Sequence, residues 1–123
     1  MTKTILIADD NPVSRELVVE ALGGEWTIVE AADGLSALAK CREERPDLAL
    51  IDIQMPHLDG FGVLTQIRAM GATQIPVIAL TAFAMQGDRE RALEAGFDGY
   101  LTKPVNLEVL RTQVRLLLRP HQL

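Results

Sequence analysis

The sequence predicts a doubly wound α/β fold, in which a five-stranded parallel sheet lies between two layers of helices. Short apolar runs alternate with helical patterns along the 123 residues, and this alternation is typical of parallel sheets covered on both faces. Several of the runs are apolar almost throughout, as expected of strands buried on both sides. No repeat, low-complexity stretch or linker interrupts the pattern. We therefore expect residues 1–123 to form one domain.

Five segments are expected to form the strands. The first, third and fourth are apolar nearly throughout, whereas the second is mixed and suits a strand near an edge. In chain order the segments are Thr4–Ala8, Trp26–Ala31, Leu48–Asp52, Pro76–Thr81 and Gly99–Thr102. The common doubly wound order for five strands is 2-1-3-4-5, the flavodoxin-like three-layer arrangement, and its switch point lies between strands 1 and 3.

The first two helices have recognisable boundaries. The first is expected to start at Asn11-Pro12, where an N-cap precedes a proline, and to stop at Gly23-Gly24. Its buried face is expected to comprise Val13, Leu17, Val18, Ala21 and Leu22. The second helix ends before Arg45-Pro46. It is expected to bury Leu35, Leu38 and Cys41.

Three further helices complete the alternation. The third ends near Gly71 and is expected to bury Phe61, Leu64 and Ile67. The fourth is expected over residues 84–95, with Gly87 in its interior, where glycine costs about 1 kcal/mol relative to alanine. This helix is therefore expected to be the softest. The fifth follows an N-cap at Asn106 and is expected to bury Leu107, Leu110, Val114 and Leu117.

Composition narrows the functional classes. The net charge of −5 argues against binding to a nucleic-acid backbone. No apolar run approaches the ~20 residues of a membrane span, and no signal peptide opens the sequence. A single cysteine, Cys41, suits a reducing compartment. The sequence thus predicts a cytoplasmic protein that binds neither nucleic acid nor membrane.

Polar side chains end or follow four of the expected strands and should meet at one edge of the sheet. They are Asp9-Asp10, Asp52, Thr81 and Lys103. Ligands of open α/β sheets bind outside the carboxyl ends of the strands at the switch point. Three carboxylates and one ammonium leave two negative charges, which match one divalent cation. Oxygen ligands favour Mg²⁺, for which Mn²⁺ is a possible substitute.

Each of these residues has a simpler interpretation when it is taken alone. Asp9-Asp10 could cap a helix or lie in a solvated loop, Thr81 could cap the fourth helix, and Lys103 could be a surface lysine. Their convergence favours a metal site that handles a phosphoryl group. In such a site a carboxylate can act as the nucleophile, as in aspartyl-phosphate chemistry.

Four motifs together resemble the receiver domain of two-component response regulators: IADDN, LALIDIQMPHLDGF, IALTAFA and GYLTKPV. The resemblance covers essentially the whole chain. It implies that Asp52 accepts a phosphoryl group from a histidine kinase. It also implies that Thr81 and Lys103 hold this group, so that the catalytic residues are Asp52, Thr81 and Lys103. Mg²⁺ would be bound by Asp9, Asp10, Asp52 and the backbone carbonyl of Gln54.

The same resemblance implies how the domain switches. Thr81 would move toward the phosphoryl group and Tyr100 would turn inward, changing the face formed by the fourth helix, fifth strand and fifth helix. Gln54 and Phe83 would tune the lifetime of the acyl phosphate, and the bulk of Phe83 would slow its hydrolysis. The Lys103-Pro104 bond is expected to be cis.

The resemblance is strongest to receivers of hybrid histidine kinases and to single-domain cell-cycle regulators. Since the chain stops soon after the fifth helix, we expect a single-domain regulator, monomeric or weakly dimeric, that signals through protein contacts. The alternative is a phosphorelay receiver that passes phosphate to a histidine phosphotransfer protein. The chain is not expected to be an enzyme beyond its own phosphorylation and dephosphorylation.

Two other classes fit the sequence less well. A Mg²⁺-dependent phosphatase usually carries an Asp-x-Asp nucleophile pair on its first strand, but this strand ends in Asp9-Asp10. A flavodoxin would need a phosphate loop rich in Ser, Thr and Gly, whereas the loop here is acidic.

Overall fold

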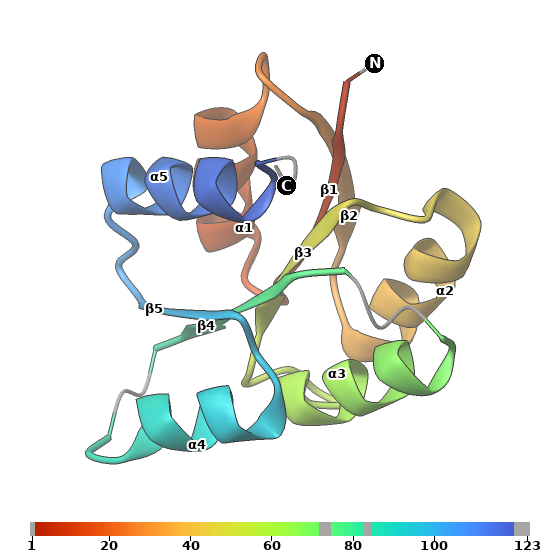
Figure 1. Ribbon diagram of the computed structural model, residues 1–123, viewed down its shortest axis with the longest axis vertical. Coiled ribbons are helices and arrows are strands. Elements are labelled where there is room, and N and C mark those ends of the chain that lie inside the picture. Colours follow the sequence, from red (N-terminus) through yellow and green to blue (C-terminus); the bar gives the residue numbers. More distant parts are fainter. Residues whose placement is uncertain (1, 72–74, 83–84, 120–123) are drawn as a thin grey trace.

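The computed structural model describes residues 2–71, 75–82 and 85–119 and has the doubly wound α/β architecture (Figure 1). Within these ranges the strands form one five-stranded parallel sheet in the order β2-β1-β3-β4-β5. The strands are β1 (Thr4–Ala8), β2 (Thr27–Ala31), β3 (Leu48–Asp52), β4 (Val77–Thr81) and β5 (Gly99–Thr102). The expected fold and strand order are confirmed, and the mixed strand β2 lies at an edge.

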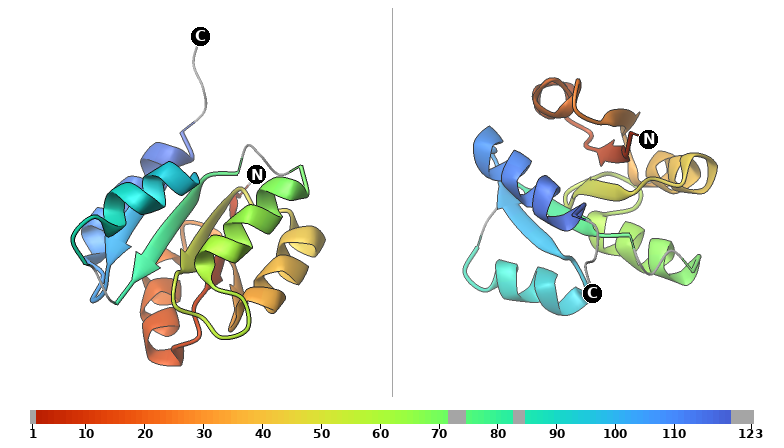
Figure 2. Two further views of the ribbon diagram at one scale, coloured as in Figure 1. Left: turned by 90° about the horizontal axis from the view of Figure 1, so that it is seen from below. Right: turned by 45° about the horizontal axis from the view of Figure 1, so that its top comes forward.

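Helices cover both faces of the sheet. They are α1 (Pro12–Leu22), α2 (Gly34–Glu44), α3 (Gly60–Ala69), α4 (Asp88–Ala95) and α5 (Leu107–Leu117). The hydrophobic clusters place α1 and α5 on one face of the sheet and α2, α3 and α4 on the other, as the right-hand view of Figure 2 shows. Within the part of the chain that the structure describes, no helix is both long and apolar enough to span a membrane.

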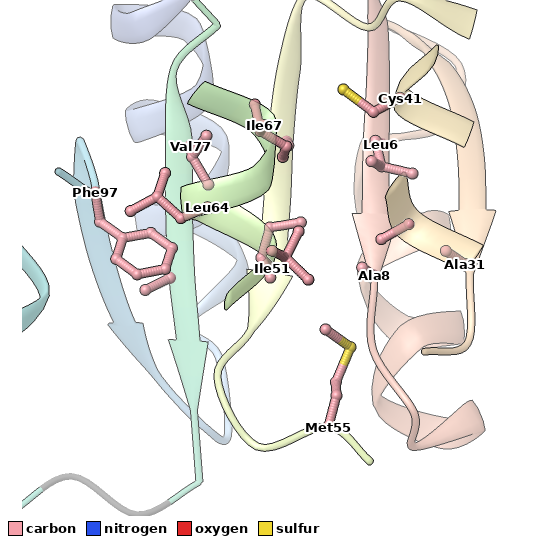
Figure 3. Packing of buried hydrophobic residues seen from close by; sticks show 14 of the residues in the cluster. Leu6, Ala8, Ala31, Cys41, Ile51, Met55, Leu64, Ile67, Val77 and Phe97 are labelled. Carbon is pink, nitrogen blue, oxygen red and sulfur yellow. The ribbon is translucent and has the colours of Figure 1, made fainter. Parts of the chain in front are cut away.

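Two hydrophobic cores result from the alternation of side chains along the strands. In β1, for example, Leu6 faces α2 and α3, whereas Ile5 and Ile7 face α1 and α5. Figure 3 shows the first core, where Ile51 of β3 lies near Leu64 of α3. Strands β3 and β4 are buried along their whole length. This explains why their sequences are apolar nearly throughout.

The expected helix caps are confirmed at α1 and α5. The side-chain oxygen of Asn11 accepts hydrogen bonds from two backbone N–H groups at the start of α1, and Asn106 does the same for α5. Pro12 occupies the first position of α1, where its missing N–H is not needed. The Lys103-Pro104 bond is cis, as expected.

The buried faces of α1 and α2 differ from the expectation. Val13 and Leu17 of α1 are 67% and 54% exposed, and Leu35 of α2 is 59% exposed. Val18 and Leu22, one helical turn apart, form the fully buried stripe of α1. Val13 and Leu17 instead line an open groove of about 470 Å³ beside the β5–α5 loop. The apolar stripe in the sequence is thus wider than the surface that the sheet covers.

The start of α4 also differs from the expectation. The helix begins at Asp88, and Gly87 is its N-cap with φ of +88°, so the glycine does not lie in the helix interior. A φ in the left-handed region is readily adopted by glycine, which has no Cβ, and Gly87 therefore suits the turn that precedes the helix. Ala84, the expected first residue, lies outside the described residues.

Candidate functional site

The carboxyl ends of four strands bring together the polar residues that the sequence analysis singled out. The parallel register pairs Ala8 with Ile51, so the residues that follow, Asp9 and Asp52, lie at the same edge. Strand β4 places Thr81 one residue beyond the partner of Asp52. The loop after β5 adds Lys103, whose N–H donates to the carbonyl of Thr81. Each side chain thus occupies the site because it ends or follows a strand.

Lys103 links the two buried carboxylates. Its Nζ lies 2.9 Å from Asp52 Oδ2 and 3.0 Å from Asp9 Oδ1, and it donates a hydrogen bond to each. The side chains of Asp9 and Asp52 are 0% and 4% exposed, and that of Lys103 is 15% exposed. An ion pair so far removed from water requires good geometry to compensate for lost hydration. One ammonium shared between two carboxylates leaves a surplus negative charge.

The backbone also stabilises the two buried carboxylates. The N–H of Asn11 donates to Asp9 Oδ1, and the N–H of Gln54 donates to Asp52 Oδ1, each at 3.0 Å. Arg15, which the sequence analysis did not single out, donates to the backbone carbonyl of Asp9 at 2.7 Å. These contacts fix the turns that carry the acidic groups.

The acidic cluster fits a hard divalent cation. Carboxylate oxygens of Asp9, Asp10 and Asp52 lie within 4.8 Å of one another. Lys103 Nζ lies 2.9 Å from Asp9 Oδ2 and 3.0 Å from Asp9 Oδ1, so the ammonium contacts both oxygens of this buried carboxylate. One ammonium cannot balance three neighbouring carboxylates, so a divalent cation would relieve the remaining repulsion among them. Asp10 is the exposed member of the cluster.

Burial and hydrogen bonding separate the two buried acids. Burial raises the pKa of Asp52 to about 6, against the opposing effect of Lys103. Burial also acts on Asp9, but hydrogen bonds from Asn11 and Lys103 outweigh it and leave the pKa of Asp9 lowered. Burial lowers the pKa of Lys103, but its two carboxylate partners raise it further, so the ammonium stays charged. Of the two buried acids, Asp52 is the one held closer to neutrality.

Thr81 and Gln54 form a contact that sequence reasoning missed. The buried Thr81 hydroxyl donates to the side-chain Oε1 of Gln54 at 2.9 Å, so the contact joins the end of β4 to the loop after β3. The sequence drew attention to both residues separately. The pairing of β3 with β4 brings the two residues close together, and their side-chain conformations make the contact.

Tyr100 is already buried in this structure. Its side chain belongs to the core beneath α3 and α4, the residue is 9% exposed, and its hydroxyl has no hydrogen-bond partner among the described residues. Tyr100 therefore already has, in this structure, the inward orientation that was expected on phosphorylation. Phe83, the other residue expected to tune the site, lies outside the described residues.

The simpler interpretations of the site residues find no support in the helix caps. Asn11 caps α1, and Gly87, which lies six positions after Thr81, is the N-cap of α4. The side chain of Lys103 is mostly buried. The convergence of these residues is thus the feature that needs a functional explanation.

Comparisons with known proteins agree on one family. The family model described as "Response regulator receiver domain" matches residues 5–115. The chain is 42% identical over 117 residues to the probable transcriptional regulatory protein TcrX of Mycobacterium tuberculosis. It is 40% identical over 111 residues to the polar-differentiation response regulator DivK of Brucella anthropi. It is 38% identical over 113 residues to the sensor histidine kinase RcsC of Escherichia coli.

These relatives differ in how much of their length the chain spans. The matches cover 94%, 87% and 91% of this chain for TcrX, DivK and RcsC. They cover 50% of TcrX, 89% of DivK and 12% of RcsC. The chain thus spans about half of the first relative and a small part of the sensor kinase.

Solved structures show the same fold. The receiver domain of the Francisella response regulator 1452 is 30% identical, with a TM-score of 0.86 over 94% of this chain and 96% of that one. The chemotaxis protein CheY4 of Vibrio cholerae is 28% identical, with a TM-score of 0.87 over 95% and 99%. Both the sequence and the backbone therefore agree with the resemblance carried by the four motifs.

Proposed function

The chain belongs to the response regulator receiver domain family, and from this membership we propose that it accepts a phosphoryl group on Asp52 from a phosphohistidine donor. Receiver domains are signalling modules of two-component and phosphorelay systems that interact with histidine kinases or phosphotransfer proteins; they are not enzymes of the usual kind. The observation that carries the proposal is the Asp52–Lys103 contact of 2.9 Å, at the edge of the sheet where three carboxylates meet.

The reaction requires a nucleophile and groups that receive the transferred charge. A carboxylate oxygen of Asp52 attacks phosphorus, the P–N bond of phosphohistidine breaks, and the bonding electrons stay on the imidazole nitrogen. Lys103 orients the Asp52 carboxylate before the reaction and lies close enough to contact a phosphoryl oxygen after it. The hydroxyl of Thr81 would contact a second oxygen. Attack of water on phosphorus later releases phosphate and restores the carboxylate.

The reaction is proposed to depend on Mg²⁺, with Mn²⁺ as a possible substitute. Asp9, Asp10, Asp52 and the backbone carbonyl of Gln54 would hold the ion, and the clustering of three carboxylates around one ammonium supports this assignment. When bound, the ion would neutralise charge on the transferred phosphoryl group. Asp9 and Asp10 would thus bind rather than react.

The wider role rests on the relatives. We propose that residues 1–123 act as one receiver domain in the cytoplasm, as a monomer or weak dimer that binds neither nucleic acid nor membrane. Phosphorylation would change contacts with a target protein at the face of α4, β5 and α5, with Thr81 and Tyr100 as the switch residues. The similarity to DivK favours this single-domain role. The similarity to RcsC favours the alternative of a phosphorelay receiver that passes phosphate to a histidine phosphotransfer protein.

Direct phosphorylation tests the proposed reaction. Wild-type protein incubated with Mg²⁺ and acetyl phosphate is expected to gain one phosphate that is labile to base, measured by intact-mass spectrometry. Asp52→Asn is expected to gain none. Glu43→Gln, which removes an exposed carboxylate in the last turn of α2, serves as the control and should behave as wild type. Equal labelling of wild type and Asp52→Asn would refute the assignment of Asp52.

A further inference from the structure

We propose that Gln54 is a positioning residue that holds the hydroxyl of Thr81 away from the phosphoryl site, so that phosphorylation must break the Gln54–Thr81 hydrogen bond. This inference deepens the proposed function and rests on it. It assigns to the side chain of Gln54 a role distinct from that of its backbone carbonyl. The consequence is that Gln54 opposes the phosphorylated state.

The backbone brings the two side chains together. Asp52 pairs with Leu80 across β3 and β4, and the N–H of Ile53 donates to the carbonyl of Leu80 at 2.8 Å. Gln54 follows Ile53 and Thr81 follows Leu80, so these two residues lie side by side at the ends of the paired strands. The N–H of Gln54 also donates to Asp52 Oδ1 at 3.0 Å, which fixes the start of its side chain. The contact thus depends on the same backbone that positions the nucleophile.

Counting donors shows why this contact competes with a phosphoryl group. A threonine hydroxyl has one proton to donate, and that of Thr81 goes to Gln54 Oε1 at 2.9 Å. Lys103 differs, because an ammonium has three protons and the two carboxylates accept only two of them. Lys103 can therefore contact a phosphoryl oxygen without giving up a partner. Thr81 must release Gln54 first.

The difference in burial sets the size of the effect. Thr81 is 1% exposed, whereas Gln54 is an exposed residue. Once released, Oε1 of Gln54 can accept hydrogen bonds from water, so the loss is that of one neutral hydrogen bond. A bond of this kind corresponds to about a threefold to tenfold change in an equilibrium constant. Removing the acceptor should therefore favour the phosphorylated state by that factor.

The first experiment examines the contact without metal or phosphate. The methyl resonance of Thr81 is recorded by NMR in EDTA. Gln54→Met keeps the length of the side chain but removes the carbonyl acceptor, and it is expected to shift this resonance. Gln54→Glu keeps an acceptor oxygen and is expected to leave the resonance near its wild-type position. Gln66→Met, the same change at an exposed residue of α3, is the control.

Two outcomes of this experiment would overturn the proposal. If Gln54→Met leaves the Thr81 resonance unchanged, the contact does not persist in solution. If Gln54→Glu shifts it as far as Gln54→Met does, the hydroxyl is not donating to an oxygen at residue 54. Both outcomes are independent of whether the protein can be phosphorylated.

The second experiment is a double-mutant cycle with the phosphoryl analogue beryllofluoride in the presence of Mg²⁺. Gln54→Met is expected to tighten binding about threefold to tenfold in the wild-type background. Thr81→Val removes the hydroxyl and keeps the shape, and in that background Gln54→Met should change the affinity by less than about twofold. An equal gain in both backgrounds, or no gain in either, would refute the mechanism.

The two proposals fail in different ways. If wild type binds no beryllofluoride and gains no phosphate, the proposed function is wrong, and the NMR experiment alone decides whether Gln54 holds Thr81. If wild type is phosphorylated on Asp52 but the cycle shows no coupling, the proposed function stands and the role of Gln54 is wrong.

Discussion

At the scale of single residues, two buried aspartates share one lysine yet differ in proton affinity. Asp52 has a pKa raised to about 6 by burial, whereas the pKa of Asp9 is lowered because hydrogen bonds from Asn11 and Lys103 outweigh burial. The difference assigns them different tasks. Asp9 stays anionic, which suits its proposed role as a metal ligand, whereas the charge of Asp52 is destabilised by burial, so a bound cation or phosphorylation would relieve it.

The raised pKa of Asp52 predicts a pH-dependent effect of its removal. Because the folded protein binds this proton more tightly than the unfolded chain does, ionisation of Asp52 lowers stability as the pH rises from about 4 to about 6. Asp52→Asn abolishes this loss, so at pH 7 the variant should be more stable than wild type by about 1 to 3 kcal/mol. At pH 4 the two should be similar. Urea unfolding in EDTA at both pH values measures the difference, and a gain that is the same at both would contradict the explanation.

The bulk of Phe83 predicts a second residue-level effect. Phe83 lies two positions after Thr81 in the sequence. The resemblance to receiver domains implies that this position tunes the lifetime of the acyl phosphate, and a bulky residue there would slow its hydrolysis. Phe83→Ala is expected to shorten the half-life of phosphorylated protein about threefold or more, on the order of 1 kcal/mol in the barrier. The loss of phosphate over time, followed by mass spectrometry, checks this. An unchanged half-life would remove Phe83 from the hydrolysis step.

At the scale of elements, α4 is the least anchored helix. It has eight residues, and Ala92 is its buried residue, whereas α2 and α3 each bury several. No side chain caps its start, and glycines in the left-handed region flank both of its ends. Little apolar area thus opposes its local opening.

This weak anchoring predicts fast hydrogen exchange. Backbone amides of α4 are expected to exchange at least tenfold faster than those of α3, measured by mass spectrometry of the phosphate-free protein. Helix α3 is the internal control, since it lies on the same face of the sheet and buries Val63, Leu64 and Ile67. Equal protection in the two helices would show that α4 is not the soft element.

The position of Gly87 predicts whether its substitution raises or lowers the stability of the protein. Alanine inside a helix would stabilise it, but Gly87 has φ of +88° and precedes the helix, so Gly87→Ala should destabilise the protein by about 1 kcal/mol. A Cβ at this position would meet no other atom within 4 Å, so the backbone alone determines the effect. Gly87→Asn should be milder, because asparagine tolerates this region better. Thermal unfolding of the two variants compares them, and a more stable Gly87→Ala would contradict the assignment of the cap.

The strands were more predictable than the helices for a physical reason. A strand buried on both faces leaves a short, wholly apolar run, so β1 and β3 have the expected bounds and β4 begins one residue later than expected. A helix has only one buried stripe, and its width depends on neighbours that the sequence does not reveal. Val13 and Leu17 fit the apolar pattern of α1 but line the open groove beside the β5–α5 loop. The start of α4 depended on the φ angle of one glycine.

The site was predictable as far as topology determines it. Asp9, Asp52, Thr81 and Lys103 each end or follow a strand, and the order of parallel strands was enough to bring them together. The contact between Gln54 and Thr81 depends on side-chain conformation and on register, which no pattern in a single sequence supplies. The burial of Tyr100 likewise depends on how α3 and α4 pack over β5.

At the scale of the whole molecule, the proposed metal binding would be linked to folding. The chain carries a net charge of −5, and the acidic cluster concentrates three carboxylates at one edge of the sheet. Folding must overcome their mutual repulsion unless a cation is bound. A cation that binds the folded state alone therefore stabilises it by mass action.

This linkage predicts a rise in Tm with Mg²⁺. At a free concentration ten times Kd the folded state gains about 1.4 kcal/mol, which raises Tm by several degrees. Asp10→Asn should remove most of this gain, because it removes one of the three carboxylates of the cluster. The fold itself should be unaffected, because Asp10 is exposed and forms no ion pair or side-chain hydrogen bond among the described residues. Addition of EDTA should reverse the rise for wild type. A rise of the same size in Asp10→Asn would place the ion elsewhere.

The contacts of Lys103 have a consequence for the protein during its synthesis. They join residues that are 94 and 51 positions apart in the chain. Strands β1 and β3 leave the ribosome long before the lysine does, so a nascent chain displays its aspartates without their ammonium partner. Only after β5 and the loop that follows it have emerged and docked can the site close. The site would thus become complete in a single step late in synthesis. A stalled or truncated product that lacks Lys103 would be unable to accept the phosphoryl group.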